Sequence, residues 1–186
     1  MLEHLYNRLK NDPEQWAQFG HFFEEKKVPA KTTLLKEGEV AHCMFYVREG
    51  CLRIWFNNDG KDVTFQFFFE HQPVSSFESF WSGQPSLFSI ESIEATSLLI
   101  LRKEGFEKLM ETFPDLKDRY FRVLLGRLTN YGKLFLSRIK DNPQKRYEEL
   151  LKDHPEIIQR VPQHYIASYL GITPISLSRI RNRRPA

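Results

Sequence analysis

The stretch that decides the fold is Gln163–Asn182, which reads QHYIASYLGITPISLSRIRN. It contains two short helical patterns joined by a turn. Ile166 and Leu170 are four residues apart and therefore share one face of the first helix. Gly171 supplies the left-handed backbone conformation that commonly ends a helix. Thr173 can cap the next helix, and the proline that follows suits its first position, where no backbone donor is needed.

Apolar residues on the second helix indicate a small core shared with the first. Leu177 and Ile180 are three apart and face back toward it together with Ile172, while Ala167 is small enough to let the helices cross closely. The stretch therefore predicts a helix-turn-helix. The alternative is a pair of ordinary amphipathic helices with a basic tail.

The charge of the C-terminal segment favours nucleic-acid binding. Residues 157–186 carry five arginines and no acidic residue, a net charge of +5. The rest of the chain has 22 Lys and Arg against 24 Asp and Glu, so the overall +3 conceals a basic end on a mildly acidic body. Neutralising DNA phosphates requires such an asymmetry.

The composition excludes several other classes of protein. The 186 residues, 41% of them hydrophobic, are enough for one medium domain and a small one. No apolar run approaches the roughly 20 residues of a bilayer span. The start of the chain lacks the apolar core of a secretory signal, so we expect a cytoplasmic protein. The two cysteines, Cys43 and Cys51, are too few for a four-thiolate cluster and support no zinc site.

Between residues 22 and 102 the chain alternates short apolar runs with turn signals, after one or two short helices in residues 1 to about 20. The expected strands are Cys43–Arg48, Cys51–Phe56, Val63–Phe69, Phe88–Glu94 and Ser97–Arg102. Asn58-Asp-Gly60 between the second and third of these is a strong hairpin signal. Strands at this spacing indicate a compact sandwich or barrel.

Helical periodicity then returns. Glu104–Thr112 is expected to form a short helix, and Pro114 opens a long one of about 25 residues. The apolar seam of the long helix consists of Tyr120, Leu124, Leu128, Tyr131 and Phe135. Its coiled-coil-like spacing suits a two-fold homodimer, and the alternative is packing on the chain's own strands. Asn142-Pro-Gln marks the end of this helix, and a further helix is expected over Gln144–Lys152.

The order of these elements resembles the Crp/Fnr superfamily of bacterial transcription regulators, over essentially the whole chain. The resemblance is carried by Leu34–Glu39, Met44–Arg53 and Ile166–Arg181, and Gly38 and Gly50 end apolar runs where a positive φ is useful.

The resemblance implies an α+β fold. Residues 1–113 would form an N-terminal antiparallel β-roll (a double-stranded β-helix or jelly roll) with flanking helices. Residues 114–141 would form the dimerisation helix, and 142–186 the helix-turn-helix domain. Because the chain stops directly after the second helix of that domain, most of the family's β-wing is expected to be absent.

In this family the β-roll commonly binds a cyclic nucleotide, with a glutamate on the ribose and an Arg-Ser/Thr pair on the phosphate. The resemblance places Glu78 at the ribose, but Ser86-Leu87 replace the Arg-Ser/Thr pair. Residues 62–101 contain five acidic residues and no Lys or Arg. A phosphodiester in a partly buried pocket needs cationic partners or dense amide donors. Cyclic AMP is therefore not expected to bind in the family's usual manner, and no cofactor is assigned.

Aromatic residues crowd the same region, and three roles stay open for them. They are core residues, they line a pocket for an apolar or aromatic effector, or the β-roll is a dimer scaffold without a ligand. An effector pocket would be lined by Phe67, Phe77, Glu78, Ser86, Phe88, Tyr120 and Leu124. Haem or metal ligation by the isolated His42 or His71 is not favoured.

If the C-terminal unit binds DNA, its second helix lies in the major groove. The side of that helix opposite its core carries Ile175, Ser178, Arg179 and Asn182. The resemblance places Arg179 at the position of a base-reading arginine, and a guanidinium suits guanine. Pro174-Ile175 replace the family's Arg-Glu pair, so a different operator is expected, with Ile175 near a thymine methyl. The expected phosphate contacts are Gln163, His164, Thr173, Ser176, Arg181 and Arg183.

Two rival interpretations have weaker support. A cupin-like metal enzyme needs clustered His and Glu, whereas the six histidines are scattered along the chain. A ligand-binding signalling module with a basic helical tail is disfavoured by the missing phosphate site and by the acid-free basic end. We therefore expect a homodimer, not an enzyme, that binds an inverted repeat in double-stranded DNA. RNA polymerase and a small-molecule effector are its further candidate partners.

Overall fold

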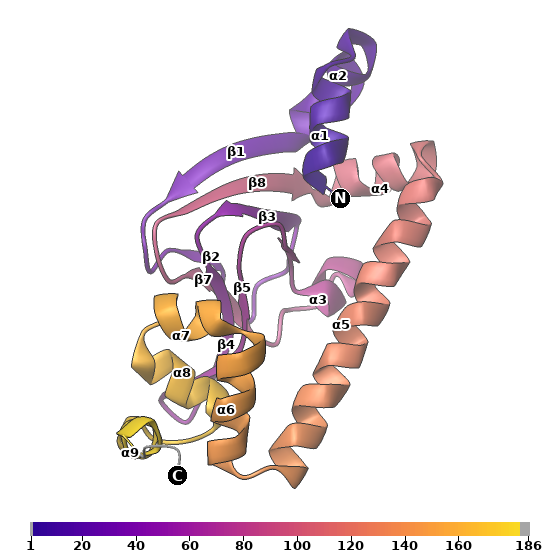
Figure 1. Cartoon of the computed structure of the whole chain (residues 1–186). Coiled ribbons are helices and arrows are strands. Elements are labelled where there is room, and N and C mark those ends of the chain that lie inside the picture. Colours follow the sequence, from indigo (N-terminus) through magenta and orange to yellow (C-terminus); the bar gives the residue numbers. More distant parts are fainter. Residues whose placement is uncertain (1, 183–186) are drawn as a thin grey trace. The chain divides into compact units, whose positions relative to one another are not determined.

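The computed structural model describes residues 2–182. The N-terminal and β-rich part contains, in chain order, α1 (Leu2–Lys10), α2 (Pro13–Phe19), the 3-10 helix η1 (Gly20–Phe22), β1 (Phe23–Val28), β2 (Thr33–Leu35), β3 (Cys43–Glu49), β4 (Leu52–Asn58), β5 (Lys61–Phe68), β6 (Pro73–Val74), α3 (Phe77–Ser82), β7 (Ser89–Ser92) and β8 (Thr96–Arg102). The helices that follow are α4 (Lys103–Thr112), α5 (Asp115–Lys140), α6 (Pro143–Asp153), α7 (Pro155–Arg160), α8 (Gln163–Leu170) and α9 (Pro174–Asn182) (Figure 1).

Two four-stranded sheets form the β-roll. Their strand orders are β1-β8-β3-β6 and β2-β7-β4-β5, and β8 pairs antiparallel with both β1 and β3. The core of the roll combines aliphatic and aromatic side chains, and among those fully buried are Val47, Leu52, Ile90, Phe68 and Phe80. This arrangement is the mixed helix and antiparallel-sheet architecture that the sequence predicted.

Residues with positive φ close the turns of the roll. Gly38 and Gly50 have φ values of +88° and +99°, as their positions at the ends of apolar runs predicted. In the β4–β5 hairpin Asp59 and Gly60 have φ values of +51° and +81°, which fits a turn with two left-handed residues. The hairpin signal in the sequence is thus confirmed.

Helices α8 and α9 are joined by the predicted turn. Gly171 ends α8 with a φ of +68°, and the Thr173 hydroxyl oxygen accepts a hydrogen bond from the Ser176 backbone nitrogen at 3.1 Å. At the start of α6 the Asn142 side chain accepts one from the Lys145 nitrogen at 2.9 Å. Helices α9 and α6 therefore both begin with a polar cap, which satisfies backbone N–H donors that have no partner within the helix.

The chain divides into two compact units. One contains residues 2–56 and 67–121, and the other contains 57–66 and 122–182. Helix α5 passes from the first unit into the second, and the tip of the β4–β5 hairpin belongs with the C-terminal helices. These packing units differ from the segments 1–113, 114–141 and 142–186 predicted from the sequence. Those segments were defined by function, as β-roll, dimerisation helix and DNA-binding domain, and this division stays a prediction.

Candidate functional site

Helix α9 turns one face to solvent. The exposed residues on this face are Ile175, Ser178, Arg179 and Asn182. Leu177 on the opposite side is fully buried, and Ile180 is half-buried. The helix therefore presents a branched apolar group, a hydroxyl, a guanidinium and an amide on one surface while its other side is fixed in a core.

That core ties α9 to α8. Ile166, Ala167 and Leu170 on α8 are buried, as is Leu177 on α9. Burying an aliphatic side chain of this size contributes roughly 1.5–3 kcal/mol, and Ala167, with no exposed surface, leaves room for close approach of the helices. Because the two helices share this core, the direction of α9 follows that of α8.

A groove of about 390 Å³ lies beside α9 within the second unit. It is lined by Asn142, Pro143 and Gln144 at the start of α6, and by Ile172, Ser176, Arg179 and Ile180. A guanidinium and the N-terminus of a helix both favour anions. The groove thus adds an anion-compatible wall next to the exposed face of α9.

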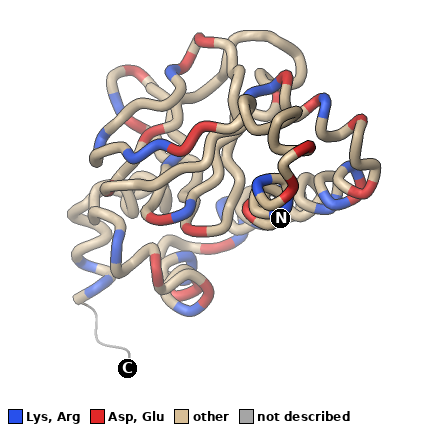
Figure 2. The backbone as a smooth tube through the Cα atoms, turned by 90° about the horizontal axis from the view of Figure 1, so that it is seen from above, with Lys and Arg blue, Asp and Glu red and all other residues tan. Residues whose placement is uncertain are grey.

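The other residues that the sequence assigned to DNA contact lie around the same helix pair. Gln163 and His164 are exposed at the start of α8, Thr173 is exposed in the turn, and Arg181 is exposed on α9. Helix α9 carries arginines and no acidic residue (Figure 2). Arg183 lies outside the described residues.

Helix α5 carries a stripe of exposed apolar side chains. The stripe consists of Phe121, Leu125, Leu128, Phe135, Leu136 and Ile139. Phe121, Leu125, Leu128, Phe135 and Ile139 follow the spacing of three and four residues that characterises a coiled-coil seam, with Gly132 completing the repeat, and Leu136 lies beside this line. Leu128 is 68% exposed and Phe135 66% exposed. Large exposed apolar stripes of this kind mark interaction surfaces.

Only two residues of the seam predicted from the sequence, Leu128 and Phe135, belong to this stripe. Tyr120 is buried in the first unit, where its ring centroid lies 4.9 Å from that of Phe106. Leu124 and Tyr131 are half-buried, and the Tyr131 ring lies 5.1 Å from Phe65 in the second unit. Tyr120 and Tyr131 thus make ring contacts within the chain, and the role of Leu128 and Phe135 in a dimer seam stays a prediction.

The segment around α3 contains buried hydroxyls that bind one another. Ser86 Oγ lies 2.8 Å from Ser76 Oγ and 2.7 Å from the Phe88 carbonyl oxygen. The Ser76 hydroxyl donates to Glu78 Oε1 at 2.7 Å. Ser76 and Ser86 are both buried, whereas Glu78 is exposed. The buried hydroxyls are thus satisfied by groups of the chain itself.

Six of the seven residues predicted to line an effector pocket belong to the first unit, and the pocket itself stays a prediction. Phe67 is buried and Phe88 half-buried in the first unit, and Phe77 contacts Tyr120 there with ring centroids 6.2 Å apart. Leu124 belongs to the second unit. Phe67 and Tyr120 have the burial expected of core residues, whereas Phe77 and Phe88 are half-buried.

Comparison with known proteins identifies the architecture. Residues 25–113 match the cyclic nucleotide-binding domain family. A Crp/Fnr-family regulator from Eubacterium rectale matches with a TM-score of 0.74 at 18% identity, over 94% of this chain and 85% of that one. FixK2 from Bradyrhizobium japonicum matches with a TM-score of 0.72 at 18% identity, over 86% and 82%. The chain has the Crp/Fnr fold. The resemblance found in the sequence is thereby confirmed.

A third similar structure is that of a regulator described by the nucleotide to which it responds. CLP from Xanthomonas campestris, described as a c-di-GMP-responsive global regulator, matches with a TM-score of 0.70 at 18% identity, over 91% of this chain and 89% of that one. A comparison with curated protein sequences found no match to this chain.

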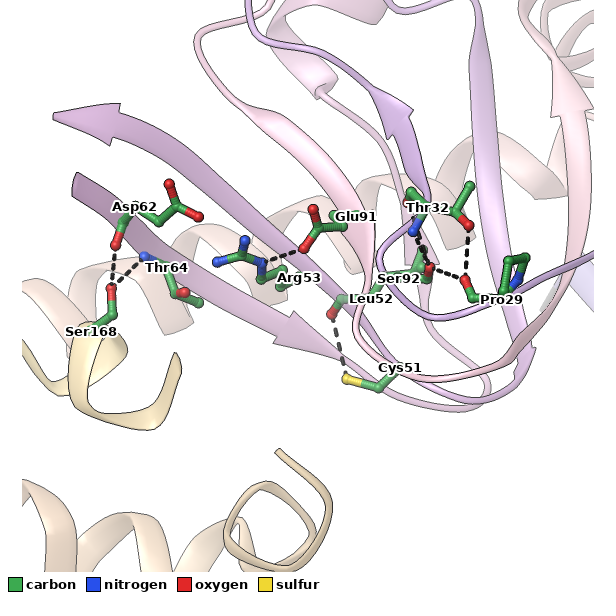
Figure 3. Close-up of polar contacts among 10 residues, drawn as sticks. All are labelled: Pro29, Thr32, Cys51, Leu52, Arg53, Asp62, Thr64, Glu91, Ser92 and Ser168. Carbon is green, nitrogen blue, oxygen red and sulfur yellow. Dashed lines mark hydrogen bonds and ion pairs between the residues drawn. The ribbon is translucent and has the colours of Figure 1, made fainter. Parts of the chain in front are cut away.

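The residues of this Crp/Fnr-fold chain do not fit a cyclic nucleotide. The hydroxyls of Ser76 and Ser86, beside the position where the family holds the phosphate, bind each other, and residues 62–101 supply no cation. Arg53 on β4 is 2% exposed, but its Nε is 3.0 Å from Glu91 Oε1 (Figure 3). Its guanidinium also lies over the Trp55 ring. A buried phosphodiester would therefore lack a charge partner in this segment.

Within residues 2–182 no group of three or more His, Cys, Asp or Glu side chains is arranged to hold a metal ion. None of the helices in that range is long and apolar enough to cross a membrane. Cys43 is half-buried, and burial raises the pKa of its thiol, which disfavours the reactive thiolate.

Proposed function

We propose that this protein is a sequence-specific DNA-binding transcription regulator that acts as a homodimer on an inverted-repeat operator in the bacterial cytoplasm. The observation that carries the proposal is the exposed face of α9, where Arg179 and its neighbours stand on a helix held by α8 and free of acidic residues. The Crp/Fnr fold of the whole chain supports it.

In this proposal α9 enters the major groove of DNA. Arg179 offers two parallel donors to O6 and N7 of guanine, and Ile175, 66% exposed, is placed for contact with a thymine methyl group. Gln163, His164, Thr173, Ser176 and Arg181 hold the phosphate backbone, which fixes the register of α9 without reading sequence.

The second part of the proposal is dimerisation through the exposed stripe of α5. If two copies of the stripe packed against each other, side chains such as Leu128 and Phe135 would be buried away from water, whereas in a single chain they are more than half exposed. A two-fold dimer presents two recognition helices, and these match half-sites about one DNA turn apart. An effector or RNA polymerase would act on this dimer, and an effector changes DNA affinity only if it binds one arrangement of the dimer better than another.

The test is selection of bound sequences from a random DNA pool, followed by affinity measurements at several salt concentrations. We expect an inverted repeat to be enriched. Arg179→Ala is expected to weaken binding to that repeat by ~1–3 kcal/mol and to relax the preference at one base pair of each half-site.

Arg181→Ala is the matched control, because it removes the same charge from the same helix. This variant is expected to weaken binding to all sequences about equally and to reduce the salt dependence by about one phosphate contact. A pool in which no motif is enriched, or identical behaviour of the two variants, contradicts the proposal.

A further inference from the structure

Three consecutive residues at the end of α8 are each hydrogen-bonded to a different element of the second unit. Ser168 binds the tip of the β4–β5 hairpin, the carbonyl of Tyr169 binds α5, and the carbonyl of Leu170 binds α6. These three elements, which lie in separate parts of the sequence, thus all contact α8, the helix that precedes α9. Helix α8 is therefore a junction.

The hairpin contact is made by one hydroxyl. Ser168 Oγ accepts a hydrogen bond from the Thr64 backbone nitrogen at 2.9 Å and donates one to the Asp62 carbonyl oxygen at 2.9 Å (Figure 3). The hydroxyl thus acts both as donor and as acceptor toward backbone groups of β5. Nearby in the chain, Phe65 packs on Tyr131 of α5, which anchors the same strand to the long helix.

The other two contacts are made by arginines at the carbonyl end of α8. Arg138 Nη2 donates to the Tyr169 carbonyl oxygen at 2.8 Å, and Arg146 Nη2 donates to the Leu170 carbonyl oxygen at 2.8 Å. The last carbonyls of a helix have no partner within it and carry the negative end of its dipole. Two guanidinium groups are therefore well suited to hold this end.

The two arginines stand on opposite sides of a break in the helical chain. Arg138 is in the last turn of α5, whereas Arg146 lies in the first part of α6, and the two helices are separated by Asp141 and the cap Asn142. Arg146 Nη1 also donates to the Asp141 carbonyl oxygen at 2.7 Å. The end of α8 is thereby tied to the helix before the break and to the helix after it.

From this geometry we infer that Arg138 is a positioning residue for DNA reading, which sets the half-site spacing that the dimer accepts. The inference rests on the proposed function. Arg138 links α5, the dimerisation helix of that proposal, directly to α8, and the shared core with Leu177 makes α9 follow α8. A change in this link alters the angle of α9 to the dimer axis and leaves the base-reading face of α9 unchanged.

The experiment uses the full chain and a series of operators. Each operator contains the half-sites selected by the wild-type protein, with the spacer shortened or lengthened by one or two base pairs. We expect wild type to favour one spacer strongly. Arg138→Gln is expected to lower affinity for that spacer by roughly 2- to 30-fold and to flatten the preference among spacers, while the preferred bases within each half-site stay the same.

Lys133→Gln is the control for lost charge, since Lys133 is exposed on the same helix and also loses one positive charge. It is expected to keep the wild-type spacer preference. Arg138→Lys, which retains a cationic donor, is expected to restore part of that preference. Ser168→Ala tests the hairpin contact and is expected to flatten the preference in the same direction. Thermal unfolding and sedimentation of each variant show whether it is folded and dimeric.

The outcomes separate the inference from the function on which it rests. If wild type selects no operator, the proposed function fails. If wild type reads an inverted repeat and folded, dimeric Arg138→Gln keeps the same spacer preference, the inference is overturned while the function stands. An equal loss of affinity at every spacer also overturns it, because that is the effect of charge alone.

Discussion

Gly50 occupies the turn between β3 and β4 with a φ of +99°, and a Cβ placed on it would lie 2.5 Å from Thr96 Oγ1 and 2.7 Å from the Ala95 carbonyl oxygen. Gly50→Ala is therefore expected to lower the free energy of unfolding by about 1–3 kcal/mol, through backbone strain and a clash with another backbone segment. Chemical denaturation measures the change. Gly126→Ala is the control: its Cβ would meet open space on α5, so an unchanged or higher stability is expected. Equal losses in both variants would refute the argument.

Glu25 on β1 is the acceptor of two strong contacts. The Tyr6 hydroxyl donates to it at 2.6 Å and Arg48 Nη1 lies 3.1 Å away, and together they hold the pKa of the Glu25 carboxyl below its ordinary value of 4.5. A lowered folded-state pKa stabilises the protein above pH 4.5, and this stabilisation is lost as the pH falls through the folded-state pKa. We expect Glu25→Gln to be less stable than wild type at neutral pH, with a difference that shrinks in acid. Urea unfolding across the pH range tests this, and a difference that is constant with pH would contradict it.

Residue-level features were predicted well where the backbone alone required them. Gly38, Gly50, Gly171 and the Asp59-Gly60 turn have the positive φ values that their sequence context indicated. The role of Arg138 could not be predicted in this way. Its partner is a carbonyl 31 positions along the chain, and no local pattern specifies such a contact.

At the scale of elements, α5 shows what periodicity leaves undecided. The helix has apolar residues on two overlapping stripes, one containing Tyr120 and Leu124 and the other Phe121 and Leu125. Both fit a helical spacing, so sequence alone cannot tell which stripe packs inside the chain. In the structure Tyr120 is buried against Phe106 and Leu124 is half-buried, whereas Phe121 and Leu125 are exposed.

The elements that the sequence did not predict are short or charged. Strand β1 reads FEEKKV and lies at the edge of its sheet, so most of its side chains are exposed and show no alternation. Strand β2 has three residues, and α3 and α7 have six each, too few for a period to be recognised.

The stripe on α5 leads to an element-scale prediction. Leu128→Glu places a charge in the centre of the proposed dimer interface, where burying it without a partner costs roughly several kcal/mol. We expect this variant to sediment as a monomer at concentrations where wild type is a dimer, with its β-roll still folded. Lys133→Glu introduces the same side chain on the same helix outside the stripe and is expected to stay dimeric. A dimeric Leu128→Glu variant, or a monomeric wild type, would disprove the assignment of the stripe.

At the scale of the whole molecule, the two packing units show a second limit of sequence reasoning. The tip of the β4–β5 hairpin, Asn57–Gln66, belongs with the C-terminal helices because its backbone binds Ser168. The order of elements along the chain gives no sign of this. The residues predicted for an effector pocket were chosen by chemistry and position in the sequence, and of these Leu124 belongs to the second unit while the other six belong to the first.

Whole-molecule stability offers a direct test of the cyclic-nucleotide fit. A ligand that binds only the folded chain stabilises it by about 2.7 kcal/mol at 100 times its Kd, which raises the Tm of a chain of this size by several degrees. Because the Ser76 and Ser86 hydroxyls bind each other and residues 62–101 contain no cation, we expect cyclic AMP, cyclic GMP and c-di-GMP to leave the Tm unchanged. The selected operator DNA serves as the positive control and is expected to raise it. A Tm increase with one of the nucleotides would mean that this chain supplies the phosphate's partners from outside residues 62–101, and the argument from the missing cation would then be wrong.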